Sequence, residues 1–438
     1  MKVTVVGAGL AGCEAAWQLA QRDVSVELIE MKPRMRSPAH VSTDFAELVC
    51  SNSLRSDELT NAVGLLKEEM RKLGSLIMKC ADENRVPAGG ALAVDRNRFS
   101  EMVTRYIRGH PNISVFEREL TDIPDGKVII ATGPLTSDKL AKKLASLLPE
   151  EKMLSFYDSA APIVTFDSID MDSAYFGSRY GKGGEDYINC PMTRDAYKAF
   201  RVELADAMVA DIHGFEDNRV FEGCVPIEVM ARRGEDTMRF GPLKPVGLID
   251  PSSGKEPYAV VQLRKDNVEG TLYNIVGFQT HLKFLEQKRV FSMIPALHSA
   301  QYARYGVMHR NTYLNSPKLL DRYNRLRTDP RIRFAGQITG VEGYVESASS
   351  GLLTGIETSR EMQNLPAADF PNETAIGALA LYTSGGAITD FQPMNVNFGL
   401  IAPLGDKVKG KRNKNMAIAQ RSLSIISGKH DPGQGVRL

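Results

Sequence analysis

The chain has 438 residues, of which 43% are hydrophobic and 24% are charged, and its formal net charge is +1. The length and composition are typical of a globular protein with roughly two or three domains. The net charge is too small for the protein to bind a polyanion through its overall charge. No run of about 18 apolar residues occurs, so no membrane span is expected. The first apolar run, Val3 to Gly9, is too short for a signal peptide, and we expect a cytoplasmic protein.

The first 30 residues predict a strand, a glycine turn, a helix and a second strand. The turn matches the motif G-x-G-x-x-G, with Gly7, Ala8, Gly9, Leu10, Ala11 and Gly12. In this motif the first glycine permits a tight turn, the second lets a pyrophosphate approach, and the third lets the helix pack on the strand. The second strand ends in Glu30, near the spacing of about 20 residues expected for a ribose-binding carboxylate. The pattern predicts a dinucleotide site without deciding between NAD and FAD.

The segment after this hairpin predicts further helix and strand. Residues 60–83 carry apolar side chains at three- and four-residue steps, which predicts one amphipathic helix. Cys80 lies on the apolar face of that helix, so its expected role is packing. Lys127 to Thr132 is a short apolar run before a Gly-Pro pair, and it predicts a buried parallel strand.

The middle of the chain differs in character from both ends. Short strand-like runs occur there, with turn signals such as Ser252-Ser253-Gly254 between them. These runs are Arg219–Phe221, Tyr258–Leu263 and Leu272–Phe278. Residues 331–360 return to the pattern of strand, glycine turn and helix. We therefore expect an α/β protein with a discontinuous dinucleotide-binding Rossmann domain, in residues 1–185 and 312–438, and an α+β domain inserted at residues 186–311.

Two later segments favour FAD as the dinucleotide. Thr132 and Gly133 end an apolar strand, which resembles the second flavin-associated segment of glutathione-reductase-like proteins. The segment from Gly336 and Gln337 to Tyr344, followed by a small-residue helix, resembles their C-terminal flavin segment. The resemblance implies that this helix points its N-terminus at the flavin, where its dipole can stabilise a reduced, anionic ring. Only one complete dinucleotide hairpin occurs, so a nicotinamide donor has no dedicated domain.

The five cysteines are odd in number, widely spaced and without a C-x-x-C pair, which argues against disulfides and structural zinc. No metal is expected, and most such thiols are packing residues. They are Cys13, Cys50, Cys80, Cys190 and Cys224. Small polar residues follow Cys50, and Arg55 is close in sequence, a setting that can lower a thiol pKa. Cys224 lies between Gly223 and Pro226, whose irregular backbone suits an exposed nucleophile. Neither context alone establishes a catalytic role.

Seven strings resemble one family, the folate- and FAD-dependent tRNA uracil-5-methyltransferases. They are AELVCSNSLRS, NAVGLLKEEMR, VPAGGALAVDR, FEGCVPIEVMA, GTLYNIVGFQTHL, GVMHRNT and GQITGVEGYVESA. The resemblance runs from the first residues to about Pro403. A relative, the wobble-uridine carboxymethylaminomethyl-modifying enzyme, has a similar hairpin and C-terminal flavin segment. That relative lacks the context of Cys50 and Cys224 and is much longer.

The resemblance implies a reaction and a role for several residues. Methylenetetrahydrofolate would supply the carbon, FAD would carry it, and NADPH (or NADH) would supply reducing equivalents. Cys224 would attack uracil C6, which makes C5 nucleophilic. Cys50 would be the second catalytic thiol, and it would either hold or protect the flavin–methylene species or remove the C5 proton. His309 would stack on the folate pterin, and Tyr344 would lie beside the flavin ring.

The implied partner is tRNA, and no obligate protein partner is evident. A uracil attacked at C6 must leave its stack, while Lys and Arg hold the neighbouring phosphates. Arg232 and Arg233 are the candidate substrate-binding residues in the insertion, with Arg239 and Lys244 nearby. The basic segment 407–414 is either a solvated helix face or a second phosphate-binding patch.

Three alternatives remain open on the sequence alone. The same chemistry could act on a ribosomal RNA uridine. A small-molecule flavin oxidoreductase would leave Cys50 and Cys224 dispensable. A non-catalytic flavoprotein that binds RNA would hold FAD without folate-dependent turnover.

Overall fold

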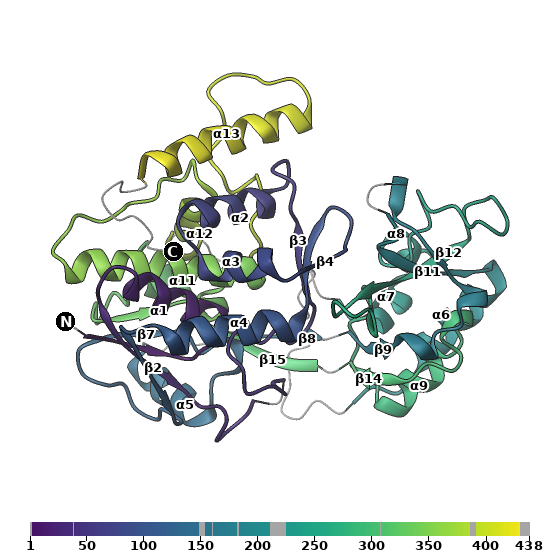
Figure 1. The fold of residues 1–438 in the computed structure, drawn as a ribbon, viewed down its shortest axis with the longest axis horizontal. Helices are drawn as coiled ribbons and strands as arrows, with labels where there is room; N and C mark the ends of the chain where they lie inside the picture. Colours follow the sequence, from purple (N-terminus) through teal and green to yellow (C-terminus); the bar gives the residue numbers. More distant parts are fainter. Residues whose placement is uncertain are drawn as a thin grey trace.

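The computed structural model describes the chain over residues 2–37, 39–148, 154–159, 161–181, 184–210, 225–306, 308–385 and 391–429. For residues 154–159 and 308–311 the backbone alone is described. These parts form two lobes that lie side by side in Figure 1. Strands β8 (Leu154–Ser159) and β15 (Met308–Tyr313) pair with each other where the two lobes meet.

A five-stranded sheet of parallel strands forms the centre of the first lobe, in the order β16-β7-β1-β2-β6. Its strands are β1 (Lys2–Val6), β2 (Ser25–Glu30), β6 (Ile113–Glu117), β7 (Lys127–Ile130) and β16 (Ile332–Phe334). The buried parallel strand predicted after residue 126 is confirmed as β7, which lies between β1 and β16. Because β16 comes from the far end of the chain, the Rossmann-type fold is discontinuous, as predicted.

Two helices of the first lobe pack directly on each other, α1 (Leu10–Ala20) and α11 (Tyr344–Met362). A Cβ atom at Gly351 would lie 2.2 Å from the carbonyl oxygen of Ala11, and one at Gly336 would lie 2.7 Å from the Ala11 Cβ. Only glycine fits at either position, because real Cβ atoms do not approach so closely. The small residues after the C-terminal flavin-like segment thus let its helix pack directly on the helix of the glycine motif.

The single helix predicted over residues 60–83 is wrong. Two helices form instead, α2 (Ala62–Lys72) and α3 (Leu76–Glu83). The chain breaks at Gly74, whose φ of +72° belongs to the left-handed region, and the side chain of Ser75 then caps α3. The apolar periodicity continues across the break, which explains the error. Cys80 is fully buried on α3, so its predicted packing role is confirmed.

The second lobe is built on a six-stranded antiparallel sheet in the order β10-β11-β12-β13-β9-β14. Its strands are β9 (Ile163–Thr165), β10 (Tyr175–Phe176), β11 (Tyr187–Met192), β12 (Ala259–Lys265), β13 (Leu272–Ile275) and β14 (Tyr302–Arg304). Its helices are α6 (Arg194–Asp206), α7 (Ile227–Arg233), α8 (Thr237–Phe240) and α9 (Phe284–Phe291). Side chains from the sheet and these helices share one core.

The strand runs predicted at 258–263 and 272–278 correspond to β12 and β13, whereas the run at 219–221 lies outside the described residues. Strands β9 and β10 of the second sheet precede residue 186. The domain limits at residues 186 and 311 remain predictions.

The remaining elements extend the first lobe. A small sheet in the order β3-β5-β4 follows the Cys50 segment. The elements are β3 (Ser53–Ser56), β4 (Arg85–Val86), β5 (Ala91–Val94), α4 (Arg96–Gly109), α5 (Asp138–Leu147), α10 (Ser316–Leu319), α12 (Ala375–Ser384) and α13 (Lys411–Lys429). In the described part of the chain, every helix is too short or too polar to cross a bilayer.

Candidate functional site

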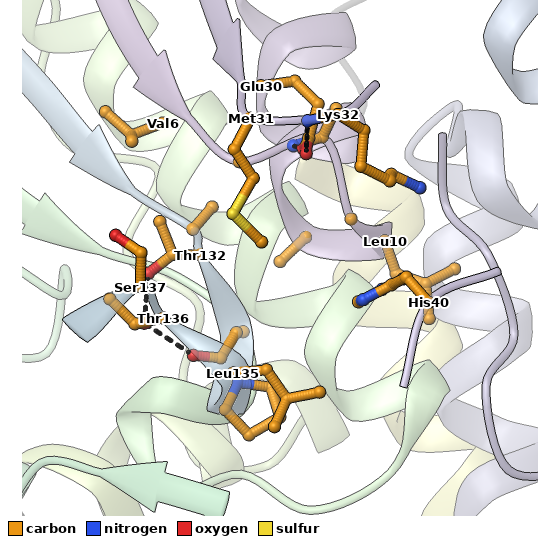
Figure 2. A pocket seen from close by; sticks show the side chains of 18 of the residues that line it. Val6, Leu10, Glu30, Met31, Lys32, His40, Thr132, Leu135, Thr136 and Ser137 are labelled. Atoms are coloured by element: carbon orange, nitrogen blue, oxygen red, sulfur yellow. Dashed lines mark hydrogen bonds between the residues drawn. The ribbon is translucent and has the colours of Figure 1, made fainter. Parts of the chain in front are cut away.

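A cavity opens where the five parallel strands end at their carboxyl edge. Each strand contributes lining residues just after its last residue: Gly7 after β1, Lys32 after β2, Arg118 after β6, Thr132 after β7 and Gln337 after β16. The volume, open mouth included, is about 1120 Å3. In open α/β sheets, ligands bind in the crevice at this edge. Figure 2 shows the side chains around the cavity, with Glu30 and Lys32 on one side and Thr132 and Thr136 across from them.

Every residue predicted to bind the cofactor lines this cavity, apart from Gly12. The lining members of that set are Gly7, Ala8, Gly9, Leu10, Ala11, Glu30, Thr132, Gly133, Gly336, Gln337 and Tyr344. Gly12 lies behind the turn, where a Cβ atom would stand 1.8 Å from the carbonyl oxygen of Gly7. The structure therefore brings together residues from three distant parts of the chain.

The glycine turn leaves one stretch of backbone open to the cavity. Gly7 has a φ of +97°, and a Cβ atom there would lie 2.6 Å from the carbonyl oxygen of Ala131. At Gly9, by contrast, nothing lies within 4 Å of the Cβ position. Helix α1 begins directly afterwards, and the first N–H groups of a helix have no partner within it and favour an anion. The turn thus fits the pyrophosphate of a dinucleotide.

Glu30 is held in a fixed orientation at the edge of the cavity. Its two carboxylate oxygens accept hydrogen bonds from the backbone N–H groups of Ala8, at 2.6 Å, and Lys32, at 2.9 Å. The side chain is nearly buried, and Figure 2 shows it beside Lys32. An ionised carboxylate only accepts hydrogen bonds, so a cofactor must offer it a donor, and a ribose hydroxyl is such a group.

We expect Glu30→Ala to weaken flavin binding by roughly 10- to 100-fold, since one charged hydrogen bond is worth about 1.5–3 kcal/mol. Flavin content after desalting and the Kd from flavin fluorescence quenching measure this. Glu27→Ala is the matched control, because Glu27 lies on the same strand but pairs with Lys2 at the surface. Equal flavin retention in the two variants would show that Glu30 does not hold the cofactor.

Several lining residues were missed by the sequence analysis. Lys32 and Arg118 lie within two residues of the carboxyl ends of β2 and β6, so the rule that ligands bind at strand carboxyl ends points to both. His40 lies in an irregular segment, where no motif marks it. Burial, and then the charge of Lys32, lower the pKa of His40, so its imidazole is neutral at pH 7. Its Nδ1 lies 2.5 Å from the Ser37 hydroxyl.

Tyr344, the first residue of α11, lines the cavity and contacts Cys50. The Tyr344 hydroxyl donates to the Cys50 sulfur at 3.1 Å and accepts the Cys50 N–H at 2.8 Å. Burial and the nearby Cys50 raise the pKa of Tyr344 well above its ordinary value, so the phenol keeps its proton for the sulfur. Two predicted site residues, 294 positions apart, are thus in direct contact.

Arg55, the arginine that is near Cys50 in the sequence, is paired elsewhere, and Arg96 contacts the segment before the thiol. Arg55 pairs with the carboxylate of Glu346 in the first turn of α11. Arg96, which is buried, donates to the carbonyl oxygen of Leu48, two residues before Cys50. Burial lowers the pKa of Arg96, but Asp266, and after it Tyr344 and Cys50, raise that pKa, so the net shift is upward. Thiols become reactive in electropositive surroundings of this kind.

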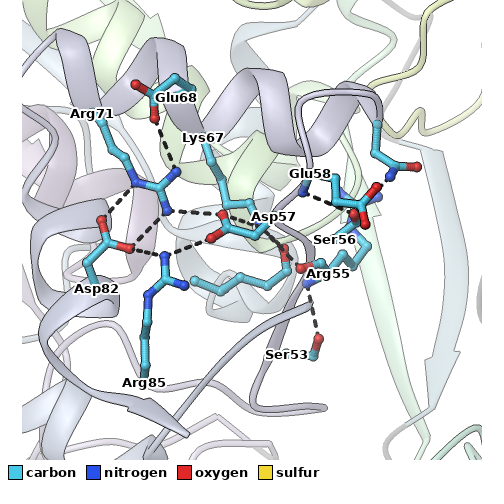
Figure 3. A network of polar contacts seen from close by, with 12 residues as sticks. Ser53, Arg55, Ser56, Asp57, Glu58, Lys67, Glu68, Arg71, Asp82 and Arg85 are labelled. Atoms are coloured by element: carbon cyan, nitrogen blue, oxygen red, sulfur yellow. Dashed lines mark hydrogen bonds and ion pairs between the residues drawn. The ribbon is translucent and has the colours of Figure 1, made fainter. Parts of the chain in front are cut away.

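A charged network fixes β3, the strand that follows the Cys50 segment (Figure 3). The buried Lys67 ammonium donates to two main-chain carbonyls of β3, one of them in Arg55, each at 3.1 Å. It also lies 3.5 Å from Asp57, which accepts hydrogen bonds from Arg71 and Arg85. Burial lowers the pKa of Lys67 to about 8, although Asp57 opposes the shift.

The titration of Lys67 predicts a pH-dependent stability. Its pKa is about 8 in the fold and 10.5 ordinarily, so the unfolded chain binds the proton more tightly. The free energy of unfolding therefore rises as the pH rises from about 8 to about 10.5, by up to about 3 kcal/mol. Urea unfolding of the wild type and of Lys67→Met across this range isolates the effect. If the difference between their free energies of unfolding stayed constant with pH, the predicted titration of Lys67 would be contradicted.

Among the other predicted site residues, Arg232 and Arg233 do not line this cavity. Cys224 is outside the described residues. The backbone of His309 lies in β15, opposite Asp158 of β8, and its side chain is outside the described structure. Arg232 and Arg233 are exposed at the end of α7, and Arg232 donates to the carbonyl oxygen of Ala205 at 2.7 Å. The basic segment 407–414 is exposed where α13 begins.

Comparisons with known proteins decide the family. The family model "Glucose inhibited division protein A" (GidA) matches residues 2–366. The methylenetetrahydrofolate–tRNA-(uracil-5-)-methyltransferase TrmFO of Acetivibrio thermocellus is 59% identical over 425 residues, which cover 97% of each chain. TrmFO of Lactobacillus gasseri is 58% identical with the same coverage. The chain belongs to both the GidA family and the TrmFO family. The family that the seven strings predicted is thereby confirmed.

A solved structure agrees with this chain in fold. GidA of Aquifex aeolicus superposes with a TM-score of 0.70 at 14% sequence identity, covering 99% of this chain and 74% of that one. At this identity the likeness shows the fold alone. It confirms the predicted α/β class with a dinucleotide-binding domain of Rossmann type.

Proposed function

We propose that this protein methylates uracil C5 in the T loop of tRNA, forming 5-methyluridine, and that it acts in the cytoplasm. Methylenetetrahydrofolate is the carbon donor, FAD the carrier and NADPH (or NADH) the reductant. The observation that carries the proposal is the contact of Cys50 with Tyr344 at the end of a dinucleotide cavity, in a chain 59% identical to a TrmFO enzyme.

The residues of the cavity fit FAD along its length. Glu30 would accept the adenosine ribose hydroxyls, and the turn at Gly9 with the start of α1 would face the pyrophosphate. Thr132, Gly133, Gln337 and Tyr344 also line the cavity. Tyr344 is assigned to the flavin end. Bound there, FAD supplies the one-carbon unit and the electrons that complete the methyl group.

The two thiols would act on the uracil ring. Uracil C5 is a poor nucleophile until a thiolate adds at C6, and this step is assigned to Cys224. Removal of the C5 proton is assigned to Cys50, whose sulfur is positioned by the Tyr344 hydroxyl. His309 is assigned to the folate pterin, and its strand β15 lies where the two lobes meet.

Binding of tRNA would involve both lobes. The target base must leave its stack to reach a thiol, so the enzyme has to hold the flanking phosphates. Arg232 and Arg233 of the second lobe are exposed and suited to that role, as is the basic segment 407–414 of the first lobe.

One experiment tests the function directly. The purified protein is incubated with labelled methylenetetrahydrofolate, NADPH and unmodified tRNA, and the expected result is label at uracil C5 of the T loop. Label in a ribosomal RNA fragment but not in a T-loop minihelix would favour the rRNA alternative. NADPH consumption with a small molecule and no label in any RNA would favour the oxidoreductase.

A further inference from the structure

Three aromatic rings form a stacked column on the second lobe. Phe284, the first residue of α9, stacks on Tyr305 with ring centroids 4.9 Å apart and planes inclined by 21°. Tyr305 stacks on Tyr302 of β14 at 4.9 Å and 12°. Phe284 ends the column and remains 53% exposed. The outer ring is thus available to one more planar group.

A buried amide keeps the column rigid. Gln287 of α9 is fully buried, and its Oε1 accepts the N–H of Gly306 at 2.8 Å. Its Nε2 donates to the carbonyl oxygens of Gly306 and Leu282, each at 2.8 Å. These bonds fix α9 against the chain just after Tyr305. A ligand therefore meets a preformed surface, which reduces the entropic cost of binding.

The column is flanked by positive charge. Lys283 and Lys288 are exposed and make no ion pair with residues that the structure describes. Arg289 adds no excess charge, because Glu286 and Glu203 hold its guanidinium on two sides. A groove beside the column is lined by Lys288, His298, Tyr302 and Tyr305. Exposed aromatic rings beside cations suit a nucleic acid better than an apolar protein face.

The column lies next to the junction of the lobes. Arg304, which precedes Tyr305, donates to the carbonyl oxygen of Ala39 in the first lobe at 3.3 Å. The following residue, His40, lines the dinucleotide cavity. Figure 1 shows β14 close to the paired strands β15 and β8. RNA held at the column would thus lie close to a segment that lines the cavity.

We infer that the column Phe284–Tyr305–Tyr302 is a stacking platform for one unpaired nucleotide of the tRNA substrate. This inference rests on the proposed function. Proteins recognise unpaired RNA bases by stacking them on aromatic side chains, while nearby cations follow the backbone. Every base has a π-face, so this contact contributes affinity rather than sequence preference.

Phe284→Ala should weaken the binding of unmodified tRNA by about 5- to 30-fold, which corresponds to about 1–2 kcal/mol of stacking. The slope of log Kd against log salt should stay unchanged, because no phosphate contact is lost. Lys288→Gln should instead lower that slope by about 0.7–0.9. Phe284→Tyr should bind like the wild type, and Phe284→Leu should bind like the alanine variant. Filter binding over a salt series measures all four.

The matched control is Phe176→Ala, which removes a partly exposed ring from β10 at the opposite edge of the same sheet and should leave tRNA binding unchanged. Flavin content reports folding. Wild-type affinity in Phe284→Ala or Phe284→Leu would overturn the platform. The platform would also be overturned if Phe284→Ala differed from the wild type in sedimentation mass but bound tRNA equally well. That result would make the column a protein interface. Weakened binding in Phe284→Ala while the wild type transfers no label would contradict the proposed function and leave the platform standing.

Discussion

Replacing Cys224 by alanine should abolish carbon transfer from methylenetetrahydrofolate to tRNA, with kcat lower by roughly 10,000-fold or more. Without a thiolate at C6, uracil C5 keeps its low nucleophilicity, and FAD and folate cannot compensate. The measurement is single-turnover transfer of labelled carbon, together with denaturing electrophoresis of enzyme mixed with 5-fluorouridine tRNA. The variant should form no covalent band, because its nucleophile is missing.

Another cysteine of the chain provides the matched control. Cys190 lies in β11 and is fully buried, and burial raises its pKa, so it stays a neutral thiol. Cys190→Ala should transfer carbon at nearly the wild-type rate and retain the covalent band. Persistence of that band in Cys224→Ala would assign the nucleophile to another residue.

Features set by neighbouring residues were predictable from the sequence. The turn from Gly7 to Gly12 follows steric rules that act within a few residues, and its partner Glu30 ends the next strand. Because parallel strands end at one edge, segments that follow different strands had to meet there. Nearly all the residues predicted to bind the cofactor therefore line the cavity.

Features set by packing between distant segments were not predictable. No local pattern shows that Tyr344 contacts Cys50, or that Arg55 pairs with Glu346 while Arg96 donates to Leu48, two residues before the thiol. The break at Gly74 was missed for a related reason, since the apolar stripe that buries α2 and α3 continues across it. The family resemblance indicated the two thiols, and the structure adds the groups that hold one of them.

We expect the buried ion pair between Arg96 and Asp266 to contribute strongly to the stability of the interface between the lobes. Arg96 begins α4 in the first lobe, and Asp266 follows β12 in the second. Their side chains are almost fully buried, with two nitrogen–oxygen distances of 2.9 and 3.2 Å. Asp266→Ala would leave the guanidinium buried without its counter-ion, which costs about 3–5 kcal/mol. Urea unfolding should show a loss of that size.

A surface pair on the same two segments gives the matched control for that loss. Arg98 of α4 pairs with Glu269, and both side chains are about half exposed. Exposed pairs contribute little, so Glu269→Ala should cost less than about 1 kcal/mol. An equally small loss in Asp266→Ala would show that the buried pair does not hold the lobes together.

A double variant separates the stability of this pair from its effect on the reaction. Arg96→Met with Asp266→Leu removes both charges and fills the space with apolar atoms, which often restores stability to a broken buried pair. Arg96 also donates to Leu48, two residues before Cys50, so its loss should free the thiol segment. We therefore expect wild-type-like unfolding but a lower kcat for carbon transfer, with the KM for tRNA little changed. Full activity in the double variant would mean that Arg96 serves only the lobe interface, whereas lost activity in a stable protein would make it a positioning residue for Cys50.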